Sequence, residues 1–244
     1  LTLGNSRSDF AGTYRFKIWS VPAPQDFVIA IGDTASDGAP AVGAGVIESP
    51  GALDRYSFTG TAGQTVYFDL LAGADAGLAW RLEDDTGAVL FNAAFIGDQP
   101  AFALPRTGTY TLTLGNSRSD FAGTYRFKIW SVPDPQDFAI AIGDTVSGGA
   151  PAVGAGVIES PGALDRYTFT GTAGQRVLFD LLSGAHAGLA WRLVDDTGAE
   201  LFNAAFIADR PSLALPRDGT YTLTLGNSRS DFAGTYSFRI VPDP

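Results

Sequence analysis

The sequence contains no cysteine, no methionine and a single histidine. Without cysteine the chain forms no disulfides and offers no thiolate metal ligands, so its domains must be stabilised by core packing alone, which is compatible with secretion. The absence of methionine, even at position 1, favours a fragment or a processed product. We therefore expect the 244 residues to be a window from a longer protein.

Basic residues are also scarce, with 16 Lys and Arg against 26 Asp and Glu, a formal net charge of −10 and a sequence pI near 4.4. Such a surface repels phosphate backbones and anionic lipid headgroups, which argues against nucleic acid as a partner. No uninterrupted apolar run is long enough for a membrane span, so we expect no membrane insertion in this segment. Phosphate-binding loops, Cys/His metal spacings and nucleophile elbows are missing as well.

The sequence does contain a long internal repeat. The passage LTLGNSRSDFAGTYRF begins at Leu1 and recurs at Leu112 and Leu223, so the period is 111 residues. A period of that length is a whole domain that can bury its own core, not a solenoid unit. We expect residues 1–22 to be the C-terminal strand pair and linker of a preceding repeat, followed by complete repeats at 23–133 and 134–244.

Short alternating segments between Gly- and Pro-rich turns fill each repeat. In Arg55–Thr59, for example, Tyr56 and Phe58 share one face and Ser57 and Thr59 the other, the pattern of a half-buried strand. The same alternation occurs in 65–71, 78–82, 108–114 and 123–129, and no segment has helical spacing over three turns. About eight strands per repeat predict tandem antiparallel β-sandwiches, with a small closed barrel as the alternative.

The order of short motifs in each repeat resembles the bacterial pre-peptidase C-terminal domain. The residues that carry the resemblance in the second repeat are Gly143–Thr145, Gly156–Gly162, Asp165–Phe169, Thr172–Gln175, Arg192–Gly198, Gly219–Leu225 and Gly234–Phe238. The resemblance implies a jelly-roll-like sandwich that is secreted or surface-borne, stands beside proteases or in tandem arrays, and is usually not catalytic. Some relatives attached to collagen-degrading proteases bind calcium, but no calcium motif of theirs matches a position here.

Candidate catalytic and metal-binding residues have simpler interpretations. His186 corresponds to Asp75 one period earlier, so a mechanism that used it as a base would leave the first repeat inert. The acidic clusters at 83–85 and 195–196 fit hairpin turns better than glycosidase acids or calcium ligands. We expect no catalytic residue and no cofactor, with calcium as the one alternative.

Four tryptophans divide into two pairs. Trp80 and Trp191 share strand faces with leucines and are predicted to be core residues. Trp19 and Trp130 precede proline-rich joints, so together with Pro133 and Pro135 they are predicted interdomain contacts, an exposed sugar-binding surface being the alternative. The third copy of the passage lacks this tryptophan.

Two functions remain in view. The first is a non-catalytic structural module of an extracellular bacterial surface protein, a stalk, fibre or filament subunit whose partners are neighbouring repeats and, through edge strands, other copies. The second is a polysaccharide- or protein-binding accessory module of a secreted hydrolase or adhesin. Its candidate surface, which also serves for assembly, is a polar loop in each repeat: Asn116, Arg118, Asp120, Asn227, Arg229 and Asp231.

Overall fold

The computed structural model describes residues 12–116 and 118–243. Every regular element in these ranges is a β-strand, and they contain no helix long and apolar enough to cross a membrane. The strands of the first repeat are β1 (Gln25–Val28), β2 (Thr34–Ala35), β3 (Val46–Ile47), β4 (Leu53–Gly60), β5 (Thr65–Ala72), β6 (Asp75–Asp84), β7 (Val89–Phe95), β8 (Gln99–Ala103), β9 (Gly108–Gly115), β10 (Gly123–Thr124) and β11 (Arg126–Val132). Those of the second are β12 (Gln136–Ala139), β13 (Thr145–Val146), β14 (Val157–Ile158), β15 (Leu164–Gly171), β16 (Arg176–Ser183), β17 (His186–Asp195), β18 (Glu200–Phe206), β19 (Arg210–Ala214), β20 (Gly219–Gly226), β21 (Gly234–Thr235) and β22 (Ser237–Pro242).

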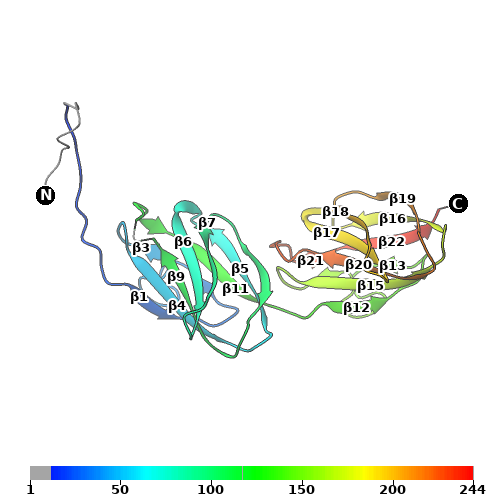
Figure 1. Ribbon diagram of the computed structural model, residues 1–244, viewed down its shortest axis with the longest axis horizontal. Coiled ribbons are helices and arrows are strands. Elements are labelled where there is room, and N and C mark those ends of the chain that lie inside the picture. Colours follow the sequence, from blue (N-terminus) through cyan, green and yellow to red (C-terminus); the bar gives the residue numbers. More distant parts are fainter. Residues whose placement is uncertain (1–11, 117, 244) are drawn as a thin grey trace.

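Each repeat is a two-layered sandwich, and the two sandwiches follow one another along the long axis of the molecule (Figure 1). In the first, a five-stranded sheet of order β1-β4-β9-β6-β7 packs on a four-stranded sheet of order β2-β11-β5-β8. The short strands β3 and β10 form a separate pair. The second repeat has the same topology, so the predicted tandem all-β sandwich is confirmed, with eight strands of at least four residues and three of two residues in each repeat.

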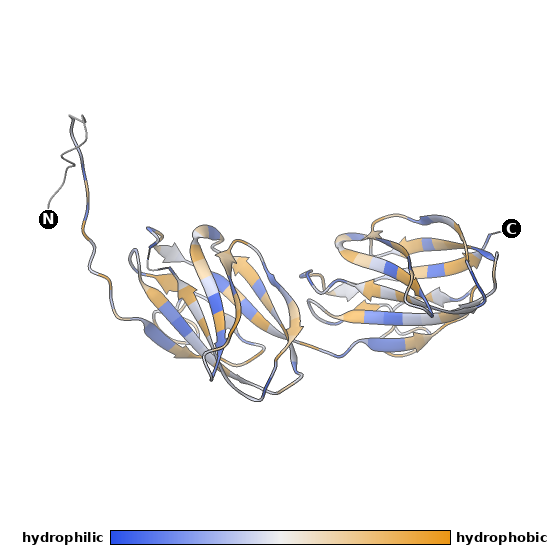
Figure 2. Ribbon diagram, in the orientation of Figure 1, coloured by the Kyte–Doolittle hydropathy of each residue, from blue (hydrophilic) through white to orange (hydrophobic). Residues whose placement is uncertain are grey.

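The alternating side chains predicted to face inward do form the cores. Tyr56 and Phe58 of the five-stranded sheet meet Phe68 and Phe127 of the four-stranded sheet in one buried cluster, and the stripes of alternating hydropathy along the strands are visible in Figure 2. Trp80 is fully buried, with its ring 4.8 Å from the ring of Phe95, so the expectation that it is a core residue is correct. The corresponding Trp191 has the same environment in the second core.

A hydrogen-bonded chain of polar groups crosses the core of each sandwich. In the first repeat the Gly45 amide donates to the Tyr56 hydroxyl (2.8 Å), which lies 2.7 Å from the Tyr125 hydroxyl, and Tyr125 donates to the buried Asp54 carboxylate. Burial raises the pKa of Asp54 to about 7. Asp165 occupies the same position in the second repeat, and burial raises its pKa to about 6.

The acidic clusters form hairpin turns, as predicted. The Asp84 carboxylate accepts hydrogen bonds from the Thr86 amide (2.9 Å), the Thr86 hydroxyl (2.6 Å) and the Ala88 amide (3.0 Å), and its second oxygen lies 3.1 Å from Nε of Arg106. Asp195 repeats this arrangement. One oxygen of each carboxylate therefore holds the turn between two strands, and the other forms an ion pair with an arginine.

The strand predicted at 123–129 is divided in the structure. Gly123 and Thr124 pair with β3, whereas Arg126 to Val132 pair with β2 and β5, so the chain passes from one sheet to another at Tyr125. Residues 12–22 have the same sequence as 123–133 but form no strand, and they leave the first sandwich as an extended segment (Figure 1). The strand pair expected in 1–22 lies half outside the described residues, and its assignment to a preceding repeat stays a prediction.

Candidate functional site

The two repeats meet in a direct contact, hereafter the joint, formed by Tyr67, Ala101 and Val132 of the first repeat with Gly162 and Ser228 of the second. The Ala101 amide of β8 donates a 2.7 Å hydrogen bond to the Ser228 carbonyl, which lies in the loop after β20. Tyr67 and Val132 belong to the same buried cluster as the core of the second repeat. The joint therefore combines a directional backbone hydrogen bond with apolar burial.

Gly162 lies in close contact with the first repeat at the joint. Its φ of +80° lies in the left-handed region, where a side chain costs energy. A Cβ at this position would lie 3.0 Å from Cβ of Ala101, 3.3 Å from Cδ2 of Tyr67 and 3.4 Å from Cγ2 of Val132, all of them in the other repeat. The local backbone thus favours glycine here, and a side chain would make the neighbouring domain shift.

Tyr67 is fully buried although it alternates out of phase with the core residues of β5. Its hydroxyl donates to Oδ2 of Asp98 (2.7 Å), and Oδ1 of Asp98 accepts from the Leu70 amide (2.8 Å). Burial and the neighbouring Asp98 carboxylate raise the pKa of Tyr67 well above its ordinary value. The phenol therefore stays neutral and keeps its hydrogen at physiological pH.

Trp130 lies beside Tyr67, because the two residues are cross-strand partners in β11 and β5. Its Nε1 donates to Oδ2 of Asp69 (2.9 Å), and the Lys128 ammonium lies 3.5 Å from the centre of its ring. Burial raises the pKa of Asp69, and the hydrogen bond from Trp130 opposes that rise. The structure thus places Trp130 in the packing behind the joint.

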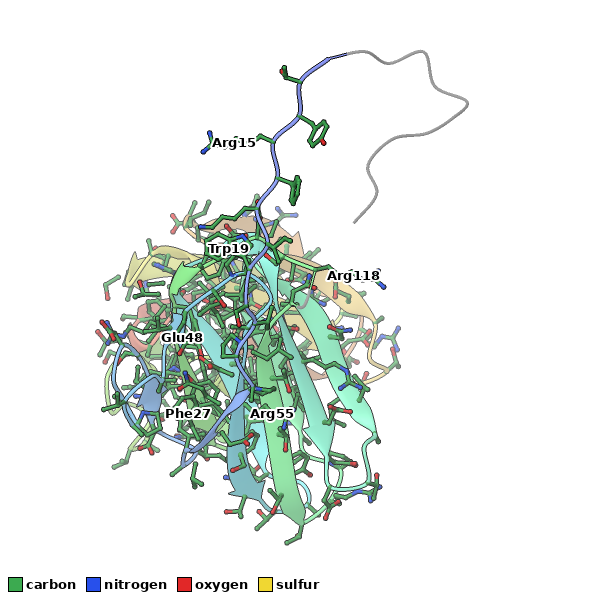
Figure 3. All side chains as sticks on the ribbon, turned by 90° about the vertical axis from the view of Figure 1, so that its left-hand side faces the viewer. Arg15, Trp19, Phe27, Glu48, Arg55 and Arg118 are labelled. Atoms are coloured by element: carbon green, nitrogen blue, oxygen red, sulfur yellow. The ribbon has the colours of Figure 1, made fainter. Side chains whose placement is uncertain are left out.

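The other predicted interdomain residues are distributed differently. Pro133 and Pro135 line a crevice of about 250 Å³ between the repeats, together with Val132, Gly162 and Leu164. Trp19 is 47% exposed and carries the Lys17 ammonium 3.4 Å from its ring centre (Figure 3). Its role as an interdomain contact stays a prediction.

Sequence reasoning missed the five residues that form the joint. One signal was available: Tyr67 is an aromatic residue on the polar face of an alternating strand, and its counterpart in the second repeat is Leu178. The contributions of Ala101, Gly162 and the Ser228 carbonyl depend on the angle between two folded domains, for which the local sequence has no signature.

The predicted polar loops are ordered by their own asparagines. Oδ1 of Asn116 accepts from the Arg118 amide (3.0 Å), and Asn227 does the same for Arg229 (3.0 Å), a common use of asparagine in turns. The side chains of Arg118, Asp120, Arg229 and Asp231 are exposed, and Arg118 points away from the sandwich in Figure 3. In the second repeat this loop also contributes Ser228 to the joint.

A second feature recurs in both repeats, a polar groove over the five-stranded sheet on the side away from the core. In the first repeat it has a volume of about 580 Å³ and is lined by Arg55, Arg81 and Thr113 among others. Its counterpart measures about 490 Å³ and is lined by Arg166, Arg192 and Thr224. The four arginines pair with carboxylates, namely Arg55 with Asp26 (3.7 Å), Arg81 with Glu83, Arg166 with Asp137 (3.0 Å) and Arg192 with Glu200 (2.7 Å). The grooves therefore offer hydrogen-bonding groups with largely compensated charge.

His186 and the acidic residues form no metal-binding cluster in the described ranges. Nδ1 of His186 accepts from the Gly188 amide (3.1 Å), and Oδ1 of Asp75 accepts from the Gly77 amide (2.7 Å) in the first repeat. The two side chains thus perform the same local task. Across residues 12–116 and 118–243, no three His, Asp or Glu side chains gather in a metal-binding group.

Comparison with known proteins finds solved structures that resemble this chain at low sequence identity. No protein-family model matches the chain, and no curated protein does. Among solved structures, the pre-peptidase C-terminal domain of collagenase from Bacillus anthracis is 17% identical over 44% of this chain and 96% of its own, with a TM-score of 0.35. The periplasmic g-type lysozyme inhibitor PliG from Aeromonas hydrophila is 12% identical over 45% and 99% (TM-score 0.33), and the CBM22-1-CBM22-2 tandem domain of Xyn10C from Paenibacillus barcinonensis is 12% identical over 87% and 91% (TM-score 0.21). A pre-peptidase C-terminal domain, which represents the family that the sequence resembles, is thus among the solved structures similar to this chain.

Proposed function

We propose that this chain is a non-catalytic structural module of an extracellular bacterial surface protein, in which consecutive sandwiches at about 23–133 and 134–244 form a stalk or fibre. The observation that carries the proposal is the joint, where the Ala101 amide bonds the Ser228 carbonyl and Gly162 accommodates Tyr67, Ala101 and Val132. A stiff spacer holds successive domains at a fixed angle, and this contact supports such an angle.

Two further features support the proposal. The repeats are alike in sequence and in topology, so each adds the same length and shape to an array. The net charge of −10 favours the solubility that an extracellular module needs. The acidic groups of the hairpin turns serve the backbone, and the single histidine has an aspartate counterpart, which agrees with a module that performs no chemistry.

The proposal is tested by introducing a steric clash at the joint. Gly162→Ala adds a methyl group against the first repeat, whereas Gly174→Ala is the matched control, because its φ of +79° carries the same backbone strain and its Cβ meets nothing within 4 Å. We expect small-angle scattering to show a wider range of interdomain distances for Gly162→Ala than for Gly174→Ala or the unmodified chain. Three identical scattering profiles would mean that the joint does not fix the angle, and the spacer proposal would fail.

The recurring polar grooves favour a second candidate, an accessory module that binds polysaccharide or protein. Paired arginines and threonines present donors and acceptors along each five-stranded sheet. Binding to a panel of glycans and matrix proteins that is lost in the double variant Arg81→Ala/Arg192→Ala would establish this function. Absence of binding across the panel would remove it.

A further inference from the structure

The second repeat brings to the joint a surface whose sequence recurs unchanged in the first repeat. This acceptor surface contains Gly162 and Ser228. The segments that carry them, 159–167 and 219–236, are identical in sequence to the segments 111 residues earlier. Both repeats therefore have the same residues on this side of the joint.

The first repeat brings to the joint a surface that does not recur. Its docking surface consists of Tyr67, Ala101 and Val132, which contact the acceptor surface, and Thr65, which lines the crevice beside them. The two sides of one contact have thus diverged unequally. Each residue of the docking surface has a different counterpart in the second repeat: Arg176 for Thr65, Leu178 for Tyr67, Ser212 for Ala101 and Asp243 for Val132.

The counterparts in the second repeat form a polar network with one another. Nη2 of Arg176 donates to Oγ of Ser212 (2.7 Å), and Nε of Arg176 lies 3.4 Å from Oδ2 of Asp243. The Asp243 amide also donates to the Arg176 carbonyl (3.0 Å), which holds the two residues side by side. The side chains of Arg176 and Asp243 are 49% and 38% exposed, so a hydrated ion pair stands where the first repeat has a threonine and a buried valine.

We propose that the second repeat does not dock a further repeat of this kind, because Arg176, Ser212 and Asp243 replace the groups that the acceptor surface fits. Rigid joints then form only behind repeats that carry the docking surface of the first repeat. A stalk built from both kinds is stiff behind the first kind and bends behind the second. This inference rests on the proposed spacer function and adds that the order of the repeats sets where the spacer is stiff.

The acceptor surface discriminates by space and by charge. A Cβ on Gly162 would lie 3.0 Å from Cβ of Ala101, so a serine in place of Ala101 adds a hydroxyl at a contact that is already close. Val132 is 7% exposed, and a carboxylate of similar size in its place would lose its water at an apolar contact. The fully buried Tyr67 also supplies apolar area and a hydrogen bond to Asp98 that a leucine cannot supply.

The strand that supports the docking surface has changed together with it. In β11 Trp130 is the cross-strand partner of Tyr67. In β22 the equivalent position holds Val241, opposite Leu178, and the next residue is Pro242, which has no amide hydrogen to donate to the sheet. The difference between the repeats therefore extends over neighbouring positions of two paired strands.

The first test transfers the polar surface into the joint. The variant Thr65→Arg/Tyr67→Leu/Ala101→Ser/Val132→Asp gives the first repeat four residues that the second repeat carries on the same topology. Spin labels at Val42→Cys and Val153→Cys report the distance between the repeats, because these equivalent valines are both 94% exposed and the sequence has no cysteine of its own. We expect a broader distance distribution than in the labelled chain without the four changes.

Val89→Glu is the matched control for this variant. It also transfers a charged residue of the second repeat, Glu200, but it lies on β7 of the other sheet. We expect its distance distribution to equal that of the unmodified labelled chain. A four-residue variant whose distribution stays as narrow as that of the control would overturn the proposal.

The second test compares two chains of three repeats and equal length. One chain doubles the first repeat (residues 1–133 followed by 23–244), and the other doubles the second (1–244 followed by 134–244), so the last joint follows a different kind of repeat in each. With labels at the positions equivalent to Val42 in the last two repeats, we expect a narrow distance distribution for the first chain and a broad one for the second. Two narrow distributions would overturn this inference and leave the spacer proposal standing, whereas two broad ones would overturn both.

Discussion

The buried carboxyl of Asp54 makes a specific prediction about stability and pH. The side chain is 0% exposed and accepts a hydrogen bond from Tyr125, and burial raises its pKa from 3.8 to about 7. Between about pH 4 and pH 7 the folded state therefore retains a proton on Asp54 that the unfolded state loses. The contribution of Asp54 to stability is largest below pH 4, falls as pH rises through the window from about 4 to about 7, and is constant above it.

The size of the fall follows from the two pKa values. At 1.36 kcal/mol per pKa unit, the step from 3.8 to about 7 corresponds to about 4 kcal/mol for Asp54. Asp165, with a pKa of about 6, contributes about 3 kcal/mol in the second repeat. These amounts are large beside the 5–15 kcal/mol that typically stabilises a domain.

Replacement of Asp54 by Asn tests the prediction, because the amide has the same shape, still accepts from Tyr125 and does not titrate. Urea unfolding at pH 4 to 8 should show the stability of Asp54→Asn rising relative to the unmodified chain by about 4 kcal/mol across that range. All other carboxylates are common to both proteins, so their effects on the free energy of unfolding cancel in the difference. A difference that stays constant within about 1 kcal/mol would refute the reasoning.

Three further predictions concern the core, the histidine and the hairpin turn. Leu112→Ala, at a fully buried position of β9, should lower the free energy of unfolding by about 2–5 kcal/mol, whereas Leu71→Ala, at a 41% exposed position, should lower it by about 0.5 kcal/mol or less in the same urea titration. His186→Asp should leave the thermal midpoint unchanged, because Asp75 accepts the equivalent amide hydrogen bond; a marked drop would show a role for the imidazole. Asp84→Ala should lower the urea midpoint near neutral pH and Asp85→Ala should not. Hydrogen bonds from Thr86 lower the pKa of Asp84, so this advantage is present above pH 4 and disappears as pH falls through the folded-state pKa.

The architecture was predictable because its signals are local. Strict alternation in segments such as 55–59 and 78–82 assigns one face of each strand to the core, and the burial of Tyr56, Phe58 and Trp80 agrees. The turn at 84–87 was predictable for the same reason, since an aspartate followed by threonine and glycine bonds its own backbone. The period of 111 residues is also the spacing between equivalent strands of the two sandwiches.

The buried polar chain was not predictable from local pattern. Tyr125 is far in sequence from Asp54 and Tyr56, and the three side chains meet because β4 and the segment between β10 and β11 come together inside the sandwich. From the sequence alone, an aspartate at the start of a strand is expected to be a turn residue. Burial between the two sheets instead raises the pKa of Asp54, so that the carboxyl binds a proton.

The sequence by itself determined that the chain is a tandem of acidic, cysteine-free β-sandwiches, because composition and alternation depend on neighbours within a few residues. Tertiary structure alone decided where the sandwiches meet and which copy of a repeated strand is covered. Residues 12–21 and 123–132 are identical in sequence, yet one copy is buried and the other exposed. A strand's environment is set by the strands beside it, and those come from distant parts of the chain.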